Sequence, residues 1–345
     1  MTSTTTVLRA GLRRPARRRA LLTAAASLPL AAPAVLAQQT SGAAAWPTRP
    51  VRLVVPFAAG GGTDVSTRLL VPKISEVLGQ PVVVENRPGA GGTTGTDYVV
   101  KQPPDGSTFL MATLSTVGLA LGLYDNLPYD PVKDLVPVAP TVLVPIGIVV
   151  RSDLGARTLQ EFIAKLKAEP GRYQYGSAGN GSSGHIACER FLSLTGTRAV
   201  HVPYRGSGPV FNDLLAGVVH FTADLPGLIA PHHQQGTLRC LVMATDQRSA
   251  LLPDVPTSAE AGLPEYKAYS WYGVFAPAGT PQPIVARMAQ AVQAALADPQ
   301  IFARLNNEMG LPPMRDYTPE RFGAFLRDEI ALWVPIVRAT GARAN

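Results

Sequence analysis

The sequence has little of what a disulfide-stabilised, membrane-spanning or disordered protein requires. Of its 345 residues, two are cysteines, 7% are aromatic and 16% are charged. Cys188 and Cys240 form no C-x-x-C pair and lack zinc-type spacing to histidine, so we expect two buried free thiols, with a disulfide as the alternative. After residue 37 no apolar run approaches the length of about 18 residues that a membrane span needs. With 46% hydrophobic residues, the composition is that of a globular protein of roughly two domains.

The positive charge is concentrated at the N-terminus. The formal net charge is +7, but residues 1–37 hold six arginines and no acid, which leaves 25 basic and 24 acidic residues elsewhere. This balance does not favour a nucleic-acid partner. An apolar run at 20–37 follows the arginines and ends in small residues, the order found in export signals. Arg18 and Arg19 resemble a twin-arginine signal, and Sec export fits as well. We expect cleavage near Ala37 and a periplasmic mature protein.

Several catalytic and nucleotide-binding motifs are also missing. The chain has no G-K-[ST] for a P-loop, its glycine runs at 60–62 and 89–92 do not complete G-x-G-x-x-G, and 181–184 does not read G-x-S-x-G. The adjacent His232 and His233 cannot easily share one helix face, so we expect a surface turn rather than a metal site. We therefore expect no catalytic residue, metal or cofactor.

Strand-like and helix-like segments alternate, which is typical of α/β proteins. One unit, at 51–78, consists of a β-branched strand, a glycine-rich turn and a helix; a second, at 172–195, repeats that order. In each unit the turn is rich in backbone N–H groups and opens a helix. Such groups, together with the positive end of the helix, form an anion site without lysine or arginine. The recurrence predicts two anion-binding turns that face each other across a cleft.

We expect a two-lobed fold in which each lobe is a mixed sheet flanked by helices, with the ligand cleft between the lobes. The strand-like runs at 142–150 and 269–277 are the expected crossings and form a hinge. Lobe one then combines 46–142 with 272–345, and lobe two is 143–271.

The C-terminal quarter is expected to be mostly helical. A helix beginning after Thr318-Pro319 carries a stripe that includes Phe322, Phe325 and Trp333. Glu329 interrupts this stripe, and we expect its side chain to reach the surface.

Eight motifs, in order, resemble the Bug family, the extracytoplasmic solute receptors of tripartite tricarboxylate transporters. They are WPTRPVRLVVPFAAGGGTD, LGQPVVVENRPGAGGTTG, PPDGSTFLMAT, LPYDPVKDLVPV, YGSAGNGSSGH, VHVPYRGSGPVFNDLLAG, LPDVPTSAEAG and WYGVFAPAGTP. The resemblance covers about residues 46–340. It implies a fold similar to type II periplasmic binding proteins, whose two lobes close over a small carboxylate.

The candidate ligand-binding residues come from two sources. The glycine-rich turns predict Ala59, Gly60, Gly61, Gly62, Thr63 and Asp64 in the first unit, and Ser177, Ala178, Gly179, Asn180, Gly181 and Ser182 in the second. His185 is either a ligand contact or a helix-start histidine bound by local backbone. The resemblance adds Thr113, Ser115, Thr116, Tyr204, Arg205, Gly206 and Asp224, with an aspartate at 224 suited to an amino group or a water. The chain departs from the family pattern at Ala223 and Leu225, which flank Asp224, and at Arg205, where lysine is commoner.

The function we expect is that of a periplasmic receptor. The resemblance implies a monomer, not an enzyme, that captures a di- or tricarboxylate, an acidic amino acid or an aromatic acid. Its partners would be the membrane subunits of a tripartite tricarboxylate transporter. Two alternatives stay open: a sensor subunit of a signalling system, and a hydrolase that uses Ser182 as nucleophile with His185 as base.

Overall fold

The computed structural model describes residues 46–204, 206–339, 341 and 343. The expected export signal, residues 1–37, lies outside this part of the chain. Within the described part, none of the helices combines the length and the apolar character needed to cross a membrane.

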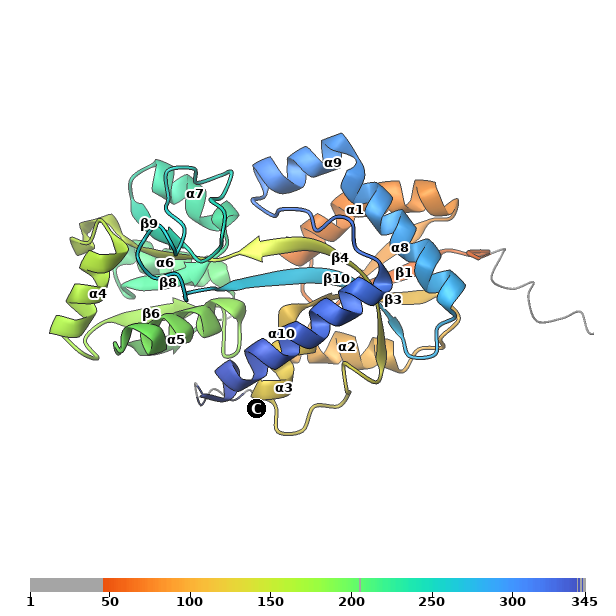
Figure 1. Cartoon of the computed structure of the whole chain (residues 1–345), viewed down its shortest axis with the longest axis horizontal. Coiled ribbons are helices and arrows are strands. Elements are labelled where there is room, and N and C mark those ends of the chain that lie inside the picture. Colours follow the sequence, from red (N-terminus) through yellow and green to blue (C-terminus); the bar gives the residue numbers. More distant parts are fainter. Residues whose placement is uncertain (1–45, 205, 340, 342, 344–345) are drawn as a thin grey trace, which may run out of the picture. The chain divides into compact units, whose positions relative to one another are not determined.

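The chain forms two mixed five-stranded sheets, and the described parts built on them are called lobe one and lobe two here (Figure 1). The sheet of lobe one has the order β2-β1-β3-β10-β4, in which β1 is parallel to β2 and β3 and β10 is antiparallel to β3 and β4. Its strands are β1 (Val51–Val55), β2 (Val82–Asn86), β3 (Thr108–Thr113), β4 (Leu135–Pro145) and β10 (Tyr269–Pro277).

The sheet of lobe two repeats this arrangement in the order β7-β6-β8-β5-β9. Strand β6 is parallel to β7 and β8, while β5 is antiparallel to β8 and β9. The strands are β5 (Gly147–Arg151), β6 (Gln174–Ser177), β7 (Val200–Pro203), β8 (Phe221–Asp224) and β9 (Leu238–Met243). Strand β10 follows β9 of lobe two along the chain and lies second from the edge in the sheet of lobe one. Strand β5 follows β4 of lobe one and has the same position in the sheet of lobe two.

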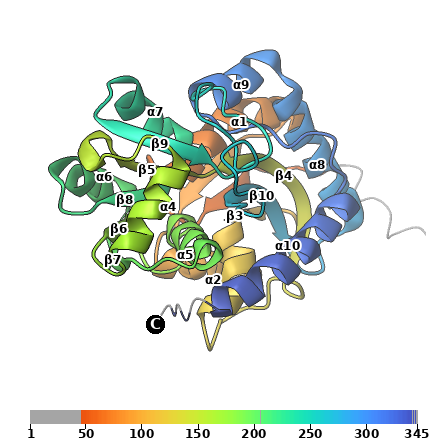
Figure 2. The ribbon, with the colours of Figure 1, turned by 60° about the vertical axis from the view of Figure 1, so that its left-hand side comes forward.

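Helices cover both faces of each sheet, and α1 and α8 lie side by side on one face in lobe one (Figure 2). Alternation along the strands accounts for this: Leu53 and Val55 join one core cluster, and Val54, between them, joins another. The helices are α1 (Gly62–Leu78), α2 (Thr93–Val100), α3 (Ala120–Leu123), α4 (Leu159–Ala168), α5 (Ser183–Thr195), α6 (Ser207–Ala216), α7 (Pro226–Gln234), α8 (Gln282–Ala297), α9 (Pro299–Ala303) and α10 (Pro319–Ala339).

Strands β4 and β10 connect the lobes and run side by side (Figure 1). The apolar run expected at 142–150 divides at Ile146, where β4 leaves one sheet and β5 enters the other. The Ile146 carbonyl accepts from the Ala244 N–H at 2.8 Å, and the Ala244 carbonyl accepts from the Ala268 N–H at 3.0 Å. The chain segments that pass between the lobes are therefore hydrogen-bonded to one another.

The expectation that Glu329 reaches the surface is wrong. Its side chain is buried and accepts from Tyr269 Oη at 2.6 Å, Trp271 Nε1 at 2.9 Å and Trp333 Nε1 at 3.2 Å. Burial raises the pKa of Glu329, although these hydrogen bonds oppose the rise. The three donors replace the hydrogen bonds that the Glu329 carboxyl would make with water, so this side chain can face the core from the apolar stripe.

The two cysteines are free and buried, as expected.

Candidate functional site

The candidate site lies where strands of both sheets end and helices begin. Strand β1 leads into α1, β6 into α5, β7 into α6 and β8 into α7, and the first or capping residues of these four helices line one cavity of about 350 Å³. This cavity is called the cleft below. The first N–H groups of a helix have no intrahelical partner and carry partial positive charge. The convergence of such ends is suited to an anion.

Side chains and backbone from both lobes line the cleft. The lining residues are Phe57, Gly61, Gly62, Thr63, Thr113, Ser115, Val144, Ile146, Ala178, Ser182, Ser183, Gly184, Gly206, Ser207, Ala223, Asp224, Leu225, Ser270 and Tyr272.

Asp64 organises the first glycine-rich turn. One carboxylate oxygen accepts from the Gly60 N–H at 2.8 Å, the other accepts from Asn86 Nδ2 at 2.9 Å, and Arg68 Nε donates to both at 2.9 and 3.0 Å. Burial acts to raise the pKa of Asp64, but these bonds outweigh burial and hold the pKa below its ordinary value. Asp64 therefore fixes the turn from inside and leaves the exposed N–H groups at the start of α1 to face the cleft.

Thr113, at the end of β3, brings an unused hydroxyl to the cleft. Thr116 Oγ1 accepts from the Thr113 N–H at 3.1 Å and donates to the Thr113 carbonyl at 3.0 Å, so the Thr113 backbone is bonded. Its own Oγ1 is buried and has no hydrogen-bond partner among the described residues. A buried polar group left unpaired costs about 1–3 kcal/mol, which a ligand oxygen at this position would recover.

The second glycine-rich turn is held by two histidines. The Gly181 N–H donates to His185 Nδ1 at 3.0 Å, and Ser177 Oγ lies 2.6 Å from His201 Nε2. The two imidazoles stack with ring centroids 3.9 Å apart. Burial lowers the pKa of each to about 4, and for His185 the neighbouring His201 adds to this effect. Both rings are therefore neutral at neutral pH and act as fixed supports for the turn.

The segment that precedes α6 is joined to this turn. The Tyr204 N–H donates to the Ser177 carbonyl at 2.9 Å, and the Gly206 N–H donates to the Ala178 carbonyl at 3.2 Å. Tyr204 Oη donates to Asp213 Oδ2 at 2.6 Å, so this hydroxyl is bound within lobe two. Two helix starts, those of α5 and α6, are thus held next to each other by backbone hydrogen bonds.

Among the described residues that line the cleft, Asp224 carries the only carboxylate and none is lysine or arginine. Burial raises the pKa of Asp224, and hydrogen bonds from the Ser207 side chain and from the Leu225 N–H (2.8 Å) oppose the rise. Positive potential in this lining comes from helix ends and backbone N–H groups. The end near Asp224 favours a hydrogen-bond donor or a neutral group over a second anion.

Comparisons with known proteins decide the family. The model of the "Tripartite tricarboxylate transporter family receptor" matches residues 67–342. The chain belongs to this family. The receptor is 38% identical to Protein BugT of Bordetella pertussis over 299 residues, which are 86% of this chain and 91% of that protein.

Two solved structures extend the comparison. MatC from Rhodopseudomonas palustris with bound malate is 35% identical, with a TM-score of 0.76 over 85% of the receptor and 100% of that chain. R. palustris Rpa4515 with adipate is 36% identical, with a TM-score of 0.78 over 86% of the receptor and 99% of that chain. The family and the two-lobed α/β fold predicted from the motifs are confirmed.

The structure brings part of the predicted residue set to the cleft. The predicted residues that line it are Gly61, Gly62, Thr63, Thr113, Ser115, Ala178, Ser182, Gly206 and Asp224. The predicted residues that are not among its lining are Ala59, Gly60, Asp64, Thr116, Ser177, Gly179, Asn180, Gly181, His185 and Tyr204. Several of these hold the turns from behind, as Asp64, Ser177 and His185 do. Arg205 lies outside the described residues.

Sequence patterns do not indicate the cleft residues that belong to the segments connecting the lobes, which are Val144, Ile146, Ser270 and Tyr272. Tyr272 is buried, and its hydroxyl lies 3.5 Å from where a Cβ on Gly62 would stand. Nothing local marks these strand residues as ligand-facing. By contrast, the Gly206-Ser207 pair before an apolar stripe is a helix-start signal that could have identified Ser207.

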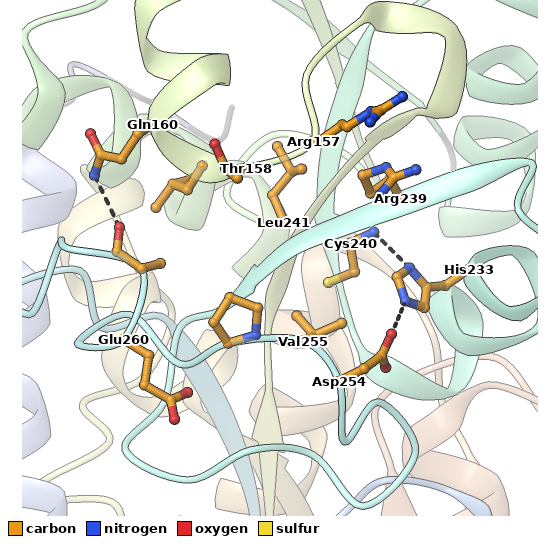
Figure 3. Close-up of a pocket in the computed structure, with 13 residues that line it drawn as sticks. Arg157, Thr158, Gln160, His233, Arg239, Cys240, Leu241, Asp254, Val255 and Glu260 are labelled. Atoms are coloured by element: carbon orange, nitrogen blue, oxygen red, sulfur yellow. Dashed lines mark hydrogen bonds and ion pairs between the residues drawn. The ribbon is translucent and has the colours of Figure 1, made fainter.

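A different cavity of about 450 Å³ lies within lobe two, between the start of α4, β9 and residues 254–261 (Figure 3). There His233 Nδ1 accepts from the Cys240 N–H at 3.1 Å, and Nε2 lies 3.0 Å from Asp254 Oδ2. The surface turn expected at His232 and His233 is wrong, because α7 continues to Gln234. No cluster of three or more histidine, cysteine or acidic residues suited to a metal occurs in the described part of the chain. Only lobe two lines this cavity, so it is a weaker candidate than the cleft.

Proposed function

We propose that the receptor captures a small carboxylate in the cleft between a lobe formed by 46–142 with 272–345 and a lobe formed by 143–271. The supporting observation is that four helix starts, that of α1 from lobe one and those of α5, α6 and α7 from lobe two, converge on one cavity with an unpaired Thr113 hydroxyl. The malate bound to MatC and the adipate bound to Rpa4515 are acids of the proposed class. The ligand is then delivered to the membrane subunits of a tripartite tricarboxylate transporter.

The finer assignments belong to the same proposal. The mature receptor is exported through the signal at residues 1–37, is cleaved near Ala37 and acts in the periplasm as a monomer without catalytic turnover. The hydrolase alternative loses its basis because His185 Nδ1 accepts from the Gly181 N–H, and Ser182 Oγ accepts from the His185 backbone N–H at 3.3 Å. The serine thus bonds the histidine backbone rather than its ring. No observation favours a sensor subunit.

A thermal-shift screen of carboxylates against the mature receptor tests the proposal. A ligand at about 100 times its Kd adds about 2.7 kcal/mol of stability, which raises Tm by roughly 4 °C in a protein of this size. We expect such a rise with at least one small carboxylate and none with the corresponding amide. Equal responses to acid and amide, or no response to any di-, tri- or aromatic carboxylate or acidic amino acid, would overturn the proposal.

Ser182→Ala is expected to weaken ligand binding moderately. It removes a cleft hydroxyl and the N-cap of α5, which costs about 1 kcal/mol of stability and about two- to tenfold in affinity. Urea unfolding and isothermal titration measure the two effects. Ser193→Ala, on the exposed part of the same helix, is the matched control. An unchanged affinity in Ser182→Ala would show that this hydroxyl does not contact the ligand.

Asp224→Asn should change ligand preference. Aspartate and malate share a skeleton but carry an ammonium and a hydroxyl group respectively, and a charged hydrogen bond to the Asp224 carboxylate contributes about 1.5–3 kcal/mol. We expect the variant to weaken aspartate binding at least about tenfold more than malate binding. General damage to the cleft would raise the Kd for aspartate and the Kd for malate alike, so it does not change the ratio of the two. The same fold-change for both acids would contradict a direct role for Asp224.

A further inference from the structure

A second cavity is shared by the lobes, on the far side of the connecting strands. This rear cavity, of about 650 Å³, is lined by Met314, Tyr317 and Phe325 from lobe one, and by residues 245–250 and Lys267 from lobe two. Leu143, Pro145 and Tyr269 of the connecting strands line it as well.

Strand alternation places the rear cavity and the cleft on opposite faces of β4 and β10. Val144 pairs with Ser270 and both line the cleft, whereas the neighbouring pair, Pro145 with Tyr269, lines the rear cavity. Successive side chains of a strand point to opposite faces. A bend of this strand pair that brings the cleft walls together must therefore move the rear walls apart.

Each rear wall is tied to its own lobe. Tyr269 and Trp271 of β10 both bond Glu329 of α10, which fixes the strand to lobe one. On the other wall, Arg248 bonds Glu260 at 2.9 Å and the Pro253 carbonyl at 2.8 Å within lobe two.

Among the described residues, no hydrogen bond or ion pair joins the two walls. Separation of the walls therefore breaks no polar contact. Side-chain volume in the rear cavity is then the quantity that limits how closely the walls approach.

We propose that the rear-cavity residues are affinity-determining positions of the receptor: they set how readily the cleft closes, although none of them lines it. This inference rests on the proposed function, because it requires the cleft to be the ligand site. A bulky side chain that holds the rear walls apart opposes opening and raises the closed fraction of the free protein. Apparent affinity rises in proportion to that fraction.

Ala250→Trp tests the proposal, because Ala250 is exposed and lines the lobe-two wall. The matched control is Ala297→Trp, an exposed alanine at the end of α8 that lines neither cavity. Small-angle scattering of the ligand-free proteins reports closure, and isothermal titration with malate and adipate reports affinity. Asn306→Phe, on the opposite wall, provides a second wedge if Ala250→Trp does not fold.

We expect the wedge variants to have a smaller radius of gyration than Ala297→Trp without ligand, and a Kd at least about threefold lower for an acid that the parent binds. The same radius of gyration in wedge and control, or a smaller radius with unchanged Kd, would overturn the inference. If the unmodified receptor binds neither malate nor adipate, that result counts against the proposed ligand class. The inference about closure is then decided by the radius of gyration of the ligand-free wedge variants compared with Ala297→Trp.

Discussion

We expect Gly184→Ala to abolish the ligand-induced rise in Tm and Gly208→Ala to leave that rise intact. Both glycines are the second residue of a helix that begins at the cleft, α5 and α6 respectively. A Cβ on Gly184 would lie 2.3 Å from the Ala223 carbonyl oxygen, whereas one on Gly208 would meet nothing within 4 Å. The collision is with backbone, so relief requires α5 to move away from β8, and both elements line the cleft.

The two variants separate the collision from the general effect of alanine in a helix. Alanine favours a helix over glycine by about 1 kcal/mol, so Gly208→Ala should be neutral or slightly stabilising. Thermal unfolding without ligand measures the stability of each variant. Thermal shift and titration with an acid that the unmodified receptor binds measure its response to ligand. A normal response in Gly184→Ala would show that the α5 start does not contribute to the site.

The receptor should lose stability as the pH falls from about 6.5 to about 4. The folded-state pKa values of His185 and His201 are about 4, below the ordinary value of 6.5. Between these values the unfolded chain binds more protons than the folded one, so the free energy of unfolding decreases with falling pH and is unaffected by these groups above about 7. For His185 alone the shift corresponds to about 3 kcal/mol.

Urea unfolding at pH 7 and pH 5 measures this loss, and His201→Gln identifies its source. The variant removes one titrating ring, so the slope of stability against pH should fall by up to about 1.4 kcal/mol per pH unit in the window. Asp224 and Glu329, whose pKa values are raised by burial, contribute with the opposite sign in parent and variant alike and cancel in the comparison. An unchanged slope would contradict the assignment to the histidine pair.

Much of the fold follows from local patterns. Thr158 caps α4 with its side chain, which accepts from the Glu161 N–H, and the Glu161 carboxylate accepts from the Arg157 N–H. Gly79 and Gly196 end their helices with positive φ. These signals depend on neighbours within a few residues, and for that reason they can be read from the chain. The export signal and the lobe boundaries stay predictions.

The glycine-rich turns show a feature that local patterns do not predict, namely how closely other parts of the chain pack against each glycine. Gly61 and Gly181 each belong to one of the two predicted turns, yet a Cβ on Gly61 would lie 3.5 Å from its nearest neighbour and one on Gly181 would lie 2.5 Å from Leu123 Cδ1. Leu123 belongs to α3, far away in sequence. Local pattern predicts a turn at both positions, but only the packed chain distinguishes the crowded glycine.

The sequence by itself determined the family, the α/β class and the two turns suited to an anion, because ordered motifs and short-range periodicity carry that information. Only the tertiary structure decided that Ser207 and Leu225 join the same cleft, that residues of the connecting strands such as Tyr272 line it, and that Glu329 is buried. Those features depend on contacts between segments distant along the chain. Strand pairing creates these contacts, and no local pattern of residues encodes them.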